Sequence, residues 1–185
     1  DRVTTIGKNA FRQCTNLVSI KIPDSVSCIG EEAFSGCENL TNIHISKNVK
    51  KISGGVFAFC ISLRQVSIPD GTISIGDEAF FGCTNLANIH IPDSVTSIGE
   101  RAFKKCISLD QISITKPIKN IGKNAFADCP VPVLIRMPST EKCLDRKTVR
   151  FYRDIGFTNI HIGDGITTIG RYAFKGYTAL TSIHI

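Results

Sequence analysis

The feature that most constrains this chain is a phrase that returns every 23 residues, with its clearest copy at residues 92–114, PDSVTSIGERAFKKCISLDQISI. Six successive rows carry a phenylalanine in register, followed three residues later by a cysteine. The phenylalanines are Phe11, Phe34, Phe57, Phe80, Phe103 and Phe126, and the cysteines are Cys14, Cys37, Cys60, Cys83, Cys106 and Cys129. Self-similarity at such a period is typical of solenoids, in which each repeat packs on its neighbours. The chain is therefore predicted to form one continuous repeat array.

About eight copies align over residues 1–185, so we expect a single array with one irregular repeat at residues 138–162. Apolar residues in and around the segment EKCLDRKTVRFYRDIGF recur there at near-helical spacing and predict one longer amphipathic helix. They are Leu144, Val149, Tyr152 and Ile155. Neither end carries a polar capping repeat, so the chain is expected to be part of a longer protein. If it does stop here, the unpaired last strand favours end-to-end self-association.

Each row contains two kinds of pattern. The closing pair, such as Ile43 and Ile45, alternates with polar residues and predicts a short, half-buried strand. In mid-row, apolar residues recur three apart, as at Phe34, Cys37 and Leu40, and predict a short helix or 3₁₀ turn on the face opposite the sheet. The glycine of each Ile-Gly pair is interpreted as turn punctuation. The predicted fold class is an α/β repeat solenoid with one short parallel strand and one short helix or 3₁₀ turn per repeat.

Two columns of residues on the strands point outward, because their neighbours point inward. All four histidines occupy one column, which also carries Lys21 and Arg136, and no acid appears in it. The second column is rich in side-chain amides. We take the following residues as the candidate partner-binding face: Lys21, Asn42, His44, Gln65, Asn88, His90, Gln111, Arg136, Asn159, His161 and His184.

The phrase IP-x-S-V-x-x-IG-x-x-AF-x-x-C-x-x-L-x-x-I-x-I, with its strand Leu40-Thr-Asn-Ile43-His-Ile45, resembles the BspA-like class of leucine-rich repeats over essentially the whole chain. The resemblance implies a right-handed leucine-rich-repeat superhelix whose sheet lines one face. It also implies a cell-surface or secreted protein used for adhesion to host or matrix proteins or to other cells.

Reaction chemistry finds no support in the sequence. No paired Cys-x₂₋₄-Cys spacing, phosphate-binding glycine loop or nucleophile elbow occurs, so we expect no enzyme activity, cofactor or metal. The periodic cysteines are interpreted as buried free thiols, since unpaired cysteine behaves as a small apolar residue. His161 and His184 could share a metal on neighbouring strands, but a third ligand is not evident. One interpretation is that these histidines are simply tolerated on an exposed strand. The other is that the histidine column binds an acidic partner, and that the affinity rises in mildly acidic surroundings because histidine then gains positive charge.

A net charge of +6 is mildly basic and is not concentrated in a way that indicates nucleic-acid binding. No apolar run is long enough for a membrane span. We therefore expect a non-enzymatic module that binds a protein or glycan through the sheet face. The alternative is a structural scaffold or spacer within a larger protein.

Overall fold

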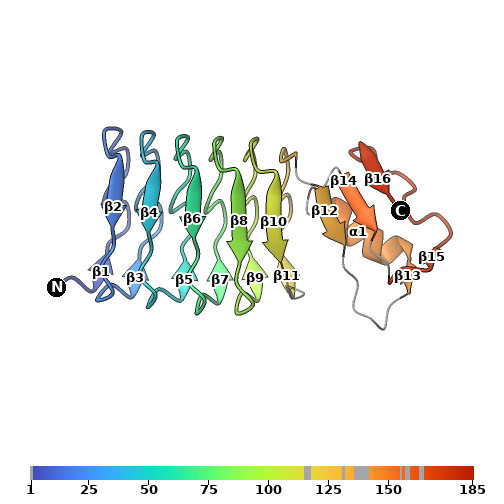
Figure 1. Cartoon of the computed structure of the whole chain (residues 1–185), viewed down its shortest axis with the longest axis horizontal. Coiled ribbons are helices and arrows are strands. Elements are labelled where there is room, and N and C mark those ends of the chain that lie inside the picture. The colour runs from blue at the N-terminus through green and yellow to red at the C-terminus, as the bar shows by residue number, and fades with distance from the viewer. Residues whose placement is uncertain are drawn as a thin grey trace.

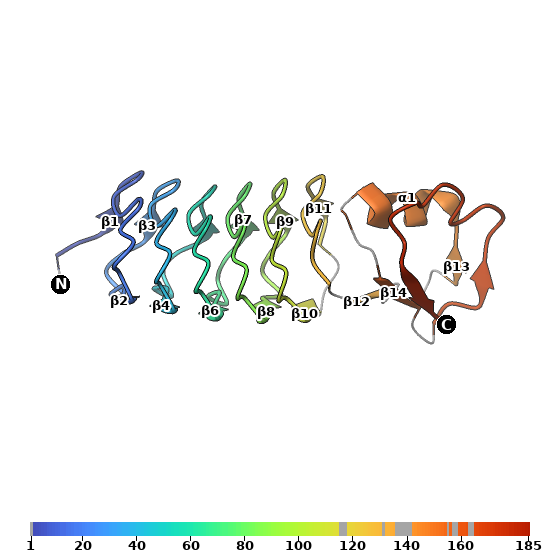
Figure 2. The same cartoon turned by 90° about the horizontal axis from the view of Figure 1, so that it is seen from above.

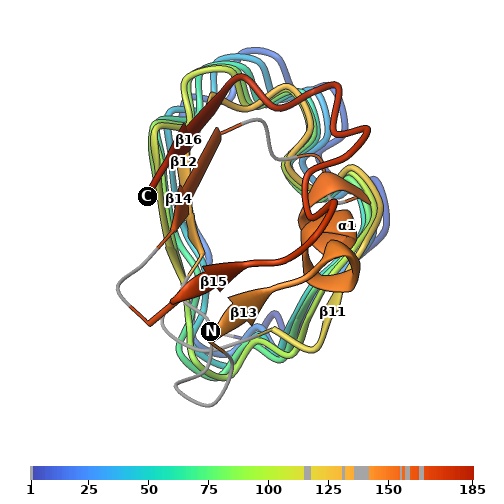
Figure 3. The ribbon, with the colours of Figure 1, turned by 90° about the vertical axis from the view of Figure 1, so that its right-hand side faces the viewer.

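The chain folds as a stack of parallel rows. The computed structural model describes residues 2–114, 118–130, 132–135, 142–154, 156, 159–162 and 165–185. Strands follow one another along the long axis (Figure 1), and the rows superimpose as one tube when viewed along that axis (Figure 3). All strand pairs that the structure describes are parallel, which confirms the solenoid and its sheet.

The predicted strands lie along one side of the stack (Figure 2). They are β2 (Ser19–Lys21), β4 (Asn42–His44), β6 (Gln65–Ser67), β8 (Asn88–Ile91), β10 (Gln111–Ile114), β12 (Pro132–Ile135), β14 (Asn159–Ile162) and β16 (Ser182–His184). Hydrogen bonds join them into the ladders β2-β4-β6, β8-β10 and β12-β14-β16. Ile43 and Val66 are buried between exposed polar neighbours, which is the predicted alternation.

A second set of two-residue strands was not predicted. These strands end at the isoleucine of each Ile-Gly pair or at the matching residue: β1 (Thr5–Ile6), β3 (Cys28–Ile29), β5 (Lys51–Ile52), β7 (Ser74–Ile75), β9 (Ser97–Ile98), β11 (Asn120–Ile121), β13 (Cys143–Leu144) and β15 (Thr168–Ile169). The longest ladder runs β5-β7-β9-β11. Two residues are too few to show a period of two, so the sequence pattern carried little strand signal here.

The helix or 3₁₀ turn predicted for each repeat is wrong: the mid-row segments are chains of turns. Within one row the amide of Ala33 bonds to Gly30 O at 3.3 Å and that of Ser35 to Glu32 O at 3.1 Å. The amide of Phe34, between them, instead donates to Val56 O in the next row at 2.9 Å. In a helix every such amide bonds within its own segment, whereas here every second one joins neighbouring rows.

Two backbone positions in each of these turns enforce that alternation. Glu32 and Gly36 both have positive φ, at 52° and 72°, and positive φ interrupts a right-handed helix. The same two columns return with period 23: Asn9, Gly55, Glu78, Arg101 and Asn124 in the first, and Gln13, Phe59, Gly82, Lys105 and Asp128 in the second. The three-residue apolar spacing thus indicated burial correctly, while the left-handed positions decided against a helix.

A stack of phenylalanine rings forms the centre of the core. Phe34, Phe57, Phe80, Phe103 and Phe126 are fully buried. Together with the partly buried Phe11 they stack with centroids 5.1 to 5.8 Å apart, one ring per row. Offset aromatic pairs contribute roughly 0.5–1.5 kcal/mol each beyond the burial itself. The phenylalanine that recurs in each of these rows thus packs in the core of the stack.

The irregular repeat contains the predicted helix, in shorter form. Helix α1 spans Arg146–Asp154, and its Val149 is buried in a second core cluster with Leu144, Ile160, Ala173 and Tyr177. Leu144, expected on the helix, belongs to strand β13 instead. Ile155 lies outside the described residues. The end of α1 joins the preceding row, since Asn124 N donates to Asp154 O at 3.0 Å, in the place where the other rows use a turn carbonyl.

The Ile-Gly glycines open the mid-row turns, as predicted, since Gly76 O accepts a hydrogen bond from Ala79 N at 3.4 Å. They also allow successive backbones to approach closely. A Cβ on Gly76 would lie 2.6 Å from Gly54 N and 2.9 Å from Ser53 C, both backbone atoms of the preceding row. Real Cβ atoms essentially never approach that closely. Position 76 therefore requires glycine, although the column is not uniform, since Ser53 occupies it one row earlier.

We expect Gly76→Ala to lower the free energy of unfolding by about 1–3 kcal/mol, because overpacking forces rigid backbone apart. Gly7→Ala is the matched control: Gly7 occupies the same column in the first row, and a Cβ there would meet nothing within 4 Å. Urea unfolding followed by circular dichroism measures both. Equal midpoints for the two variants would contradict the close-approach role.

Candidate functional site

The outward columns of the strand face are in the predicted register over the first five long strands. Lys21 lies opposite His44, Asn42 opposite Gln65, and His90 opposite Ser113. The side chains of Lys21, Asn42, His44, Gln65, Asn88 and His90 are exposed. Parallel strands lie about 4.8 Å apart, so each column is a closely spaced line of polar side chains. Gln111 is placed by strand register alone.

Toward the C-terminus the predicted register is wrong by two residues. Strand β12 pairs Leu134 with His161 and Pro132 with Asn159, whereas Arg136 was expected opposite His161. Two closing pairs, Val133/Ile135 and Ile135/Met137, fit the alternation equally well, and a shift of two keeps the same side chains inward. Arg136 itself lies outside the described residues.

His161 and His184 lie on neighbouring strands, as predicted, because β14 pairs with β16 and places the two histidines opposite each other. His184 is exposed, while Asn159 and His161 are placed by register alone. Across the described residues, no group of three or more His, Cys, Asp or Glu side chains has an arrangement that could hold a metal ion.

Acidic residues lie beside the strand face, although its outward columns contain none. Asp70 and Asp93, which follow the strands, line a hollow of about 350 Å³ together with His90 and Pro92. Nearby, Lys47 Nζ lies 2.9 Å from Asp24, and its hydrogen bond lowers the pKa of that carboxyl. The sequence could have indicated these acids through its recurring Ile-x-Ile-Pro-Asp order, because Asp93 comes three residues after His90. A partner would thus meet amides and cations edged by carboxylates.

The cysteine column is structural. Cys37, Cys60, Cys83, Cys106 and Cys129 are buried, and each Sγ donates to the carbonyl oxygen of the phenylalanine one row earlier at 2.9 to 3.2 Å. Burial raises the pKa of Cys60 to about 12 and that of Cys83 well above its ordinary value. Thiolate is the reactive form of cysteine, so these thiols are suited to packing. Cys14, Cys28 and Cys143 are free and exposed.

A thiol reagent should distinguish the two groups. Three of the eight cysteines, Cys14, Cys28 and Cys143, are expected to react rapidly in the native protein, and all eight after denaturation. Mass spectrometry after brief iodoacetamide treatment at pH 8 counts them. The expected order follows from exposure and from the raised pKa of the buried thiols. Rapid native labelling of Cys60 or Cys83 would contradict it.

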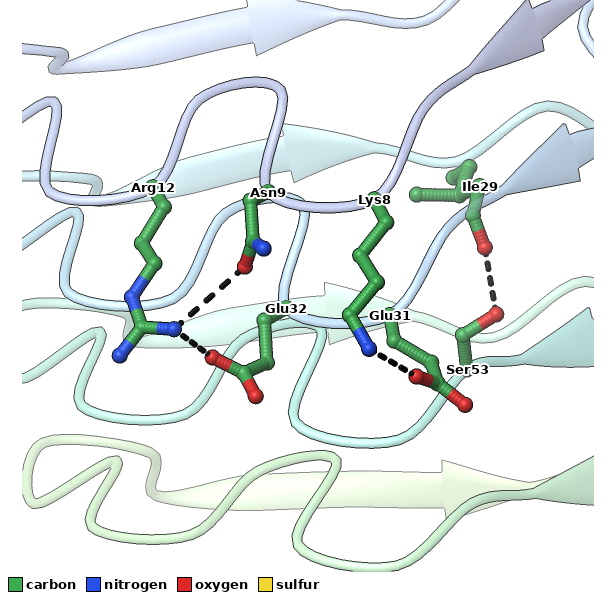
Figure 4. Close-up of polar contacts among 7 residues, drawn as sticks. All are labelled: Lys8, Asn9, Arg12, Ile29, Glu31, Glu32 and Ser53. Atoms are coloured by element: carbon green, nitrogen blue, oxygen red, sulfur yellow. Dashed lines mark hydrogen bonds and ion pairs between the residues drawn. The ribbon is translucent and has the colours of Figure 1, made fainter.

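Sequence reasoning missed a second surface on the turn side. Ion pairs join successive rows there: Lys8 with Glu31 at 2.8 Å, and Arg12 with Glu32 (Figure 4). Farther along the stack, Arg101 pairs with Glu78 at 3.0 Å. All these side chains are exposed to solvent, which screens their charges, so the pairs contribute little to stability. The sequence could have indicated this surface through opposite charges one repeat apart, such as Lys8 and Glu31, which are 23 residues apart.

Beside these ion pairs runs a groove of about 1140 Å³, lined by the short strands β5, β7 and β9 and by turn residues including Glu32 and Phe59. Phe59 is 52% exposed although its backbone has a φ of 60°, an uncommon conformation for a bulky residue. Its ring lies over Gly82 and meets Phe81 edge-on at 5.2 Å. Three of the five lining acids, Glu31, Glu32 and Glu78, have cationic partners, so the groove carries mixed charge with one aromatic edge.

In the part of the chain that the structure describes, no helical segment combines the length and apolarity of a membrane span.

Comparison with known proteins agrees with the geometry. A family model described as the BspA type leucine-rich repeat region matches six copies over residues 2–139 and 147–185. A leucine-rich cell surface protein from Faecalibacterium prausnitzii is 43% identical with a TM-score of 0.61, over 63% of this chain and 31% of that one. A leucine-rich repeat protein from Bacteroides ovatus is 26% identical with a TM-score of 0.60, over 98% and 64%. The chain thus spans about one third and two thirds of these two proteins.

The leucine-rich repeat protein of T. pallidum is 25% identical with a TM-score of 0.61, over 85% of this chain and 78% of that one. No match was found among curated proteins.

Proposed function

Because the chain belongs to the BspA-type leucine-rich repeat family, we propose that it is a non-enzymatic module that binds a protein partner through its strand face. The observation that carries the proposal is the line of exposed side chains on the strands β2, β4, β6 and β8, from Lys21 and Asn42 to Asn88 and His90. Amides both donate and accept hydrogen bonds, so a row of them matches the polar groups of a protein surface. The exposed amides of the strand face are therefore suited to binding a protein partner.

Display at a cell surface is part of the proposal. The similar protein of F. prausnitzii is described as a cell surface protein, and that location comes to this chain by family likeness alone. Adhesion to a host or matrix protein is the activity we propose there. Fold-level likeness is a weak guide to function, so the strand face itself has to be tested.

A second candidate is a spacer that separates other parts of a larger protein. The continuous phenylalanine stack favours it, since Phe11 to Phe126 form one column without a break and would make a stiff rod. A spacer requires no particular side chains on its outer face. The two candidates therefore differ in what a surface substitution does.

The double variant Asn42→Arg/Asn88→Arg should weaken binding to a matrix-protein partner at least about tenfold, because two bulky cations enter the centre of the face. Asn39→Arg/Asn85→Arg is the matched control, with the same exchange at exposed asparagines three residues earlier in the same two rows. Surface plasmon resonance against immobilised matrix proteins measures both. Equal affinity for the two variants would remove the strand face as the site, and no binding by the wild type would favour the spacer.

A further inference from the structure

The positive charge of this protein is concentrated around its one described helix. Residues 142–185 hold seven of the 22 Lys and Arg but only three of the 16 Asp and Glu. The remaining 141 residues are close to balanced, with 15 cations and 13 acids. The irregular repeat, in which α1 replaces the usual turns, thus also lies in the part of the chain with the largest excess of positive charge. This surface is separate from the strand face, since α1 lies across the tube from β12, β14 and β16 (Figure 3).

Helix α1 and the turn at residues 173–177 enclose a pocket of about 550 Å³. Val149 is buried and anchors the helix to the second core, and residues three and four places along a helix share its face. That spacing places Arg146 and Arg153 beside Val149, and places Arg150 beside Arg146 and Arg153. The pocket is lined by five cationic residues and three others, with no carboxylate among them: Arg146, Lys147, Arg150, Arg153, Lys175, Val149, Ala173 and Tyr177.

Internal ion pairs neutralise only part of this charge. Asp154 lies 2.9 Å from Arg153 and 3.5 Å from Arg150. Arg146 and Lys147 have no ion pair with any carboxylate in the described residues. They also stand in the first turn of α1, which holds no acid, and the helix dipole disfavours cations at that end. Asp145 directly precedes the helix, so one acid already stands at this end, and the two cations of the first turn outnumber it.

The pocket also has an apolar floor. Val149, Ala173 and Tyr177 are 2%, 5% and 7% exposed. Burial raises the pKa of Tyr177 to about 12, so its phenol stays neutral and adds no negative charge. A volume of about 550 Å³ lies within the range of about 300–1,000 Å³ typical of small-molecule sites. It exceeds what a bare inorganic anion fills, which indicates an anionic group attached to a ring or chain.

We propose that this pocket binds the sulfate-ester groups of a linear sulfated glycan. The sulfates would pair with the cations of α1 and with Lys175, and an apolar face of the sugar would pack on Val149 and Ala173. This inference goes beyond the proposed function and does not depend on it, because it concerns another surface and another ligand.

A nucleic acid presents phosphates of similar charge, but the pocket offers its bases little. Single-stranded binding relies on exposed aromatic rings for base stacking. Tyr177 is buried, and the exposed Tyr172 is already covered by Arg171 at 4.7 Å and Lys175 at 4.9 Å from its ring centre. The described side chains of the site would contact phosphates alone. The observations therefore favour the glycan.

The test measures binding of a heparin-derived octasaccharide by isothermal titration calorimetry near physiological salt, with the desulfated octasaccharide as the ligand control. We expect the double variant Arg146→Glu/Lys147→Glu to lose at least about tenfold in affinity. Acids suit the first turn of a helix, so its melting temperature should not fall. The matched control is Arg64→Glu/Lys50→Glu, which makes the same charge change at exposed residues in other rows and should lose less than about threefold.

Lys175→Glu provides an independent variant on the turn side of the pocket, and it too should weaken binding. Equal losses for the pocket and control variants would show that only net charge matters and would overturn the proposal. So would undiminished binding of the desulfated octasaccharide. If single-stranded DNA of equal charge binds as tightly and depends equally on Arg146 and Lys147, the site serves nucleic acid and the glycan assignment is wrong.

Discussion

Backbone hydrogen bonds between one row and the next hold this molecule together and shape everything else in it. They form on both sides of the tube: between parallel strands such as β4 and β6, and between turns, where Phe34 N donates to Val56 O. Buried backbone groups need such partners. Since every row must present its amides and carbonyls at the height of its neighbours, each row is held close to the same backbone path.

That requirement explains features that otherwise look unrelated. Glycine follows the isoleucine in most rows because adjacent backbones approach closely there, as Gly76 approaches Gly54. Glutamates, asparagines and even Phe59 adopt positive φ because the turn must aim alternate amides at the next row. The cysteine thiol donates to a phenylalanine carbonyl one row away, adding a further contact between rows. A helix would bond within itself, and among the residues that the structure describes only α1, at the irregular repeat, departs in this way.

Stacking also determines what the surfaces can be. Side chains of one column recur at the row spacing, so a single choice of residue becomes a line along the molecule. On the strand side this gives the exposed amides and histidines, such as Asn42 and His44; on the turn side it gives ion pairs such as Lys8 with Glu31. Where α1 replaces a turn, the column rule no longer applies, and the cations gather around one pocket instead.

The sequence by itself determined the repeat, the buried Phe and Cys columns, the strands with their outward face, and a helix near Val149, because burial follows from which residues recur in register. It did not determine the mid-row backbone, since apolar spacing at Phe34 and Cys37 is the same for a helix and for turns. It also left the register of β12 open, because Val133/Ile135 and Ile135/Met137 alternate alike. Only the tertiary structure decided these points, through hydrogen bonds and close approaches between residues more than 20 positions apart.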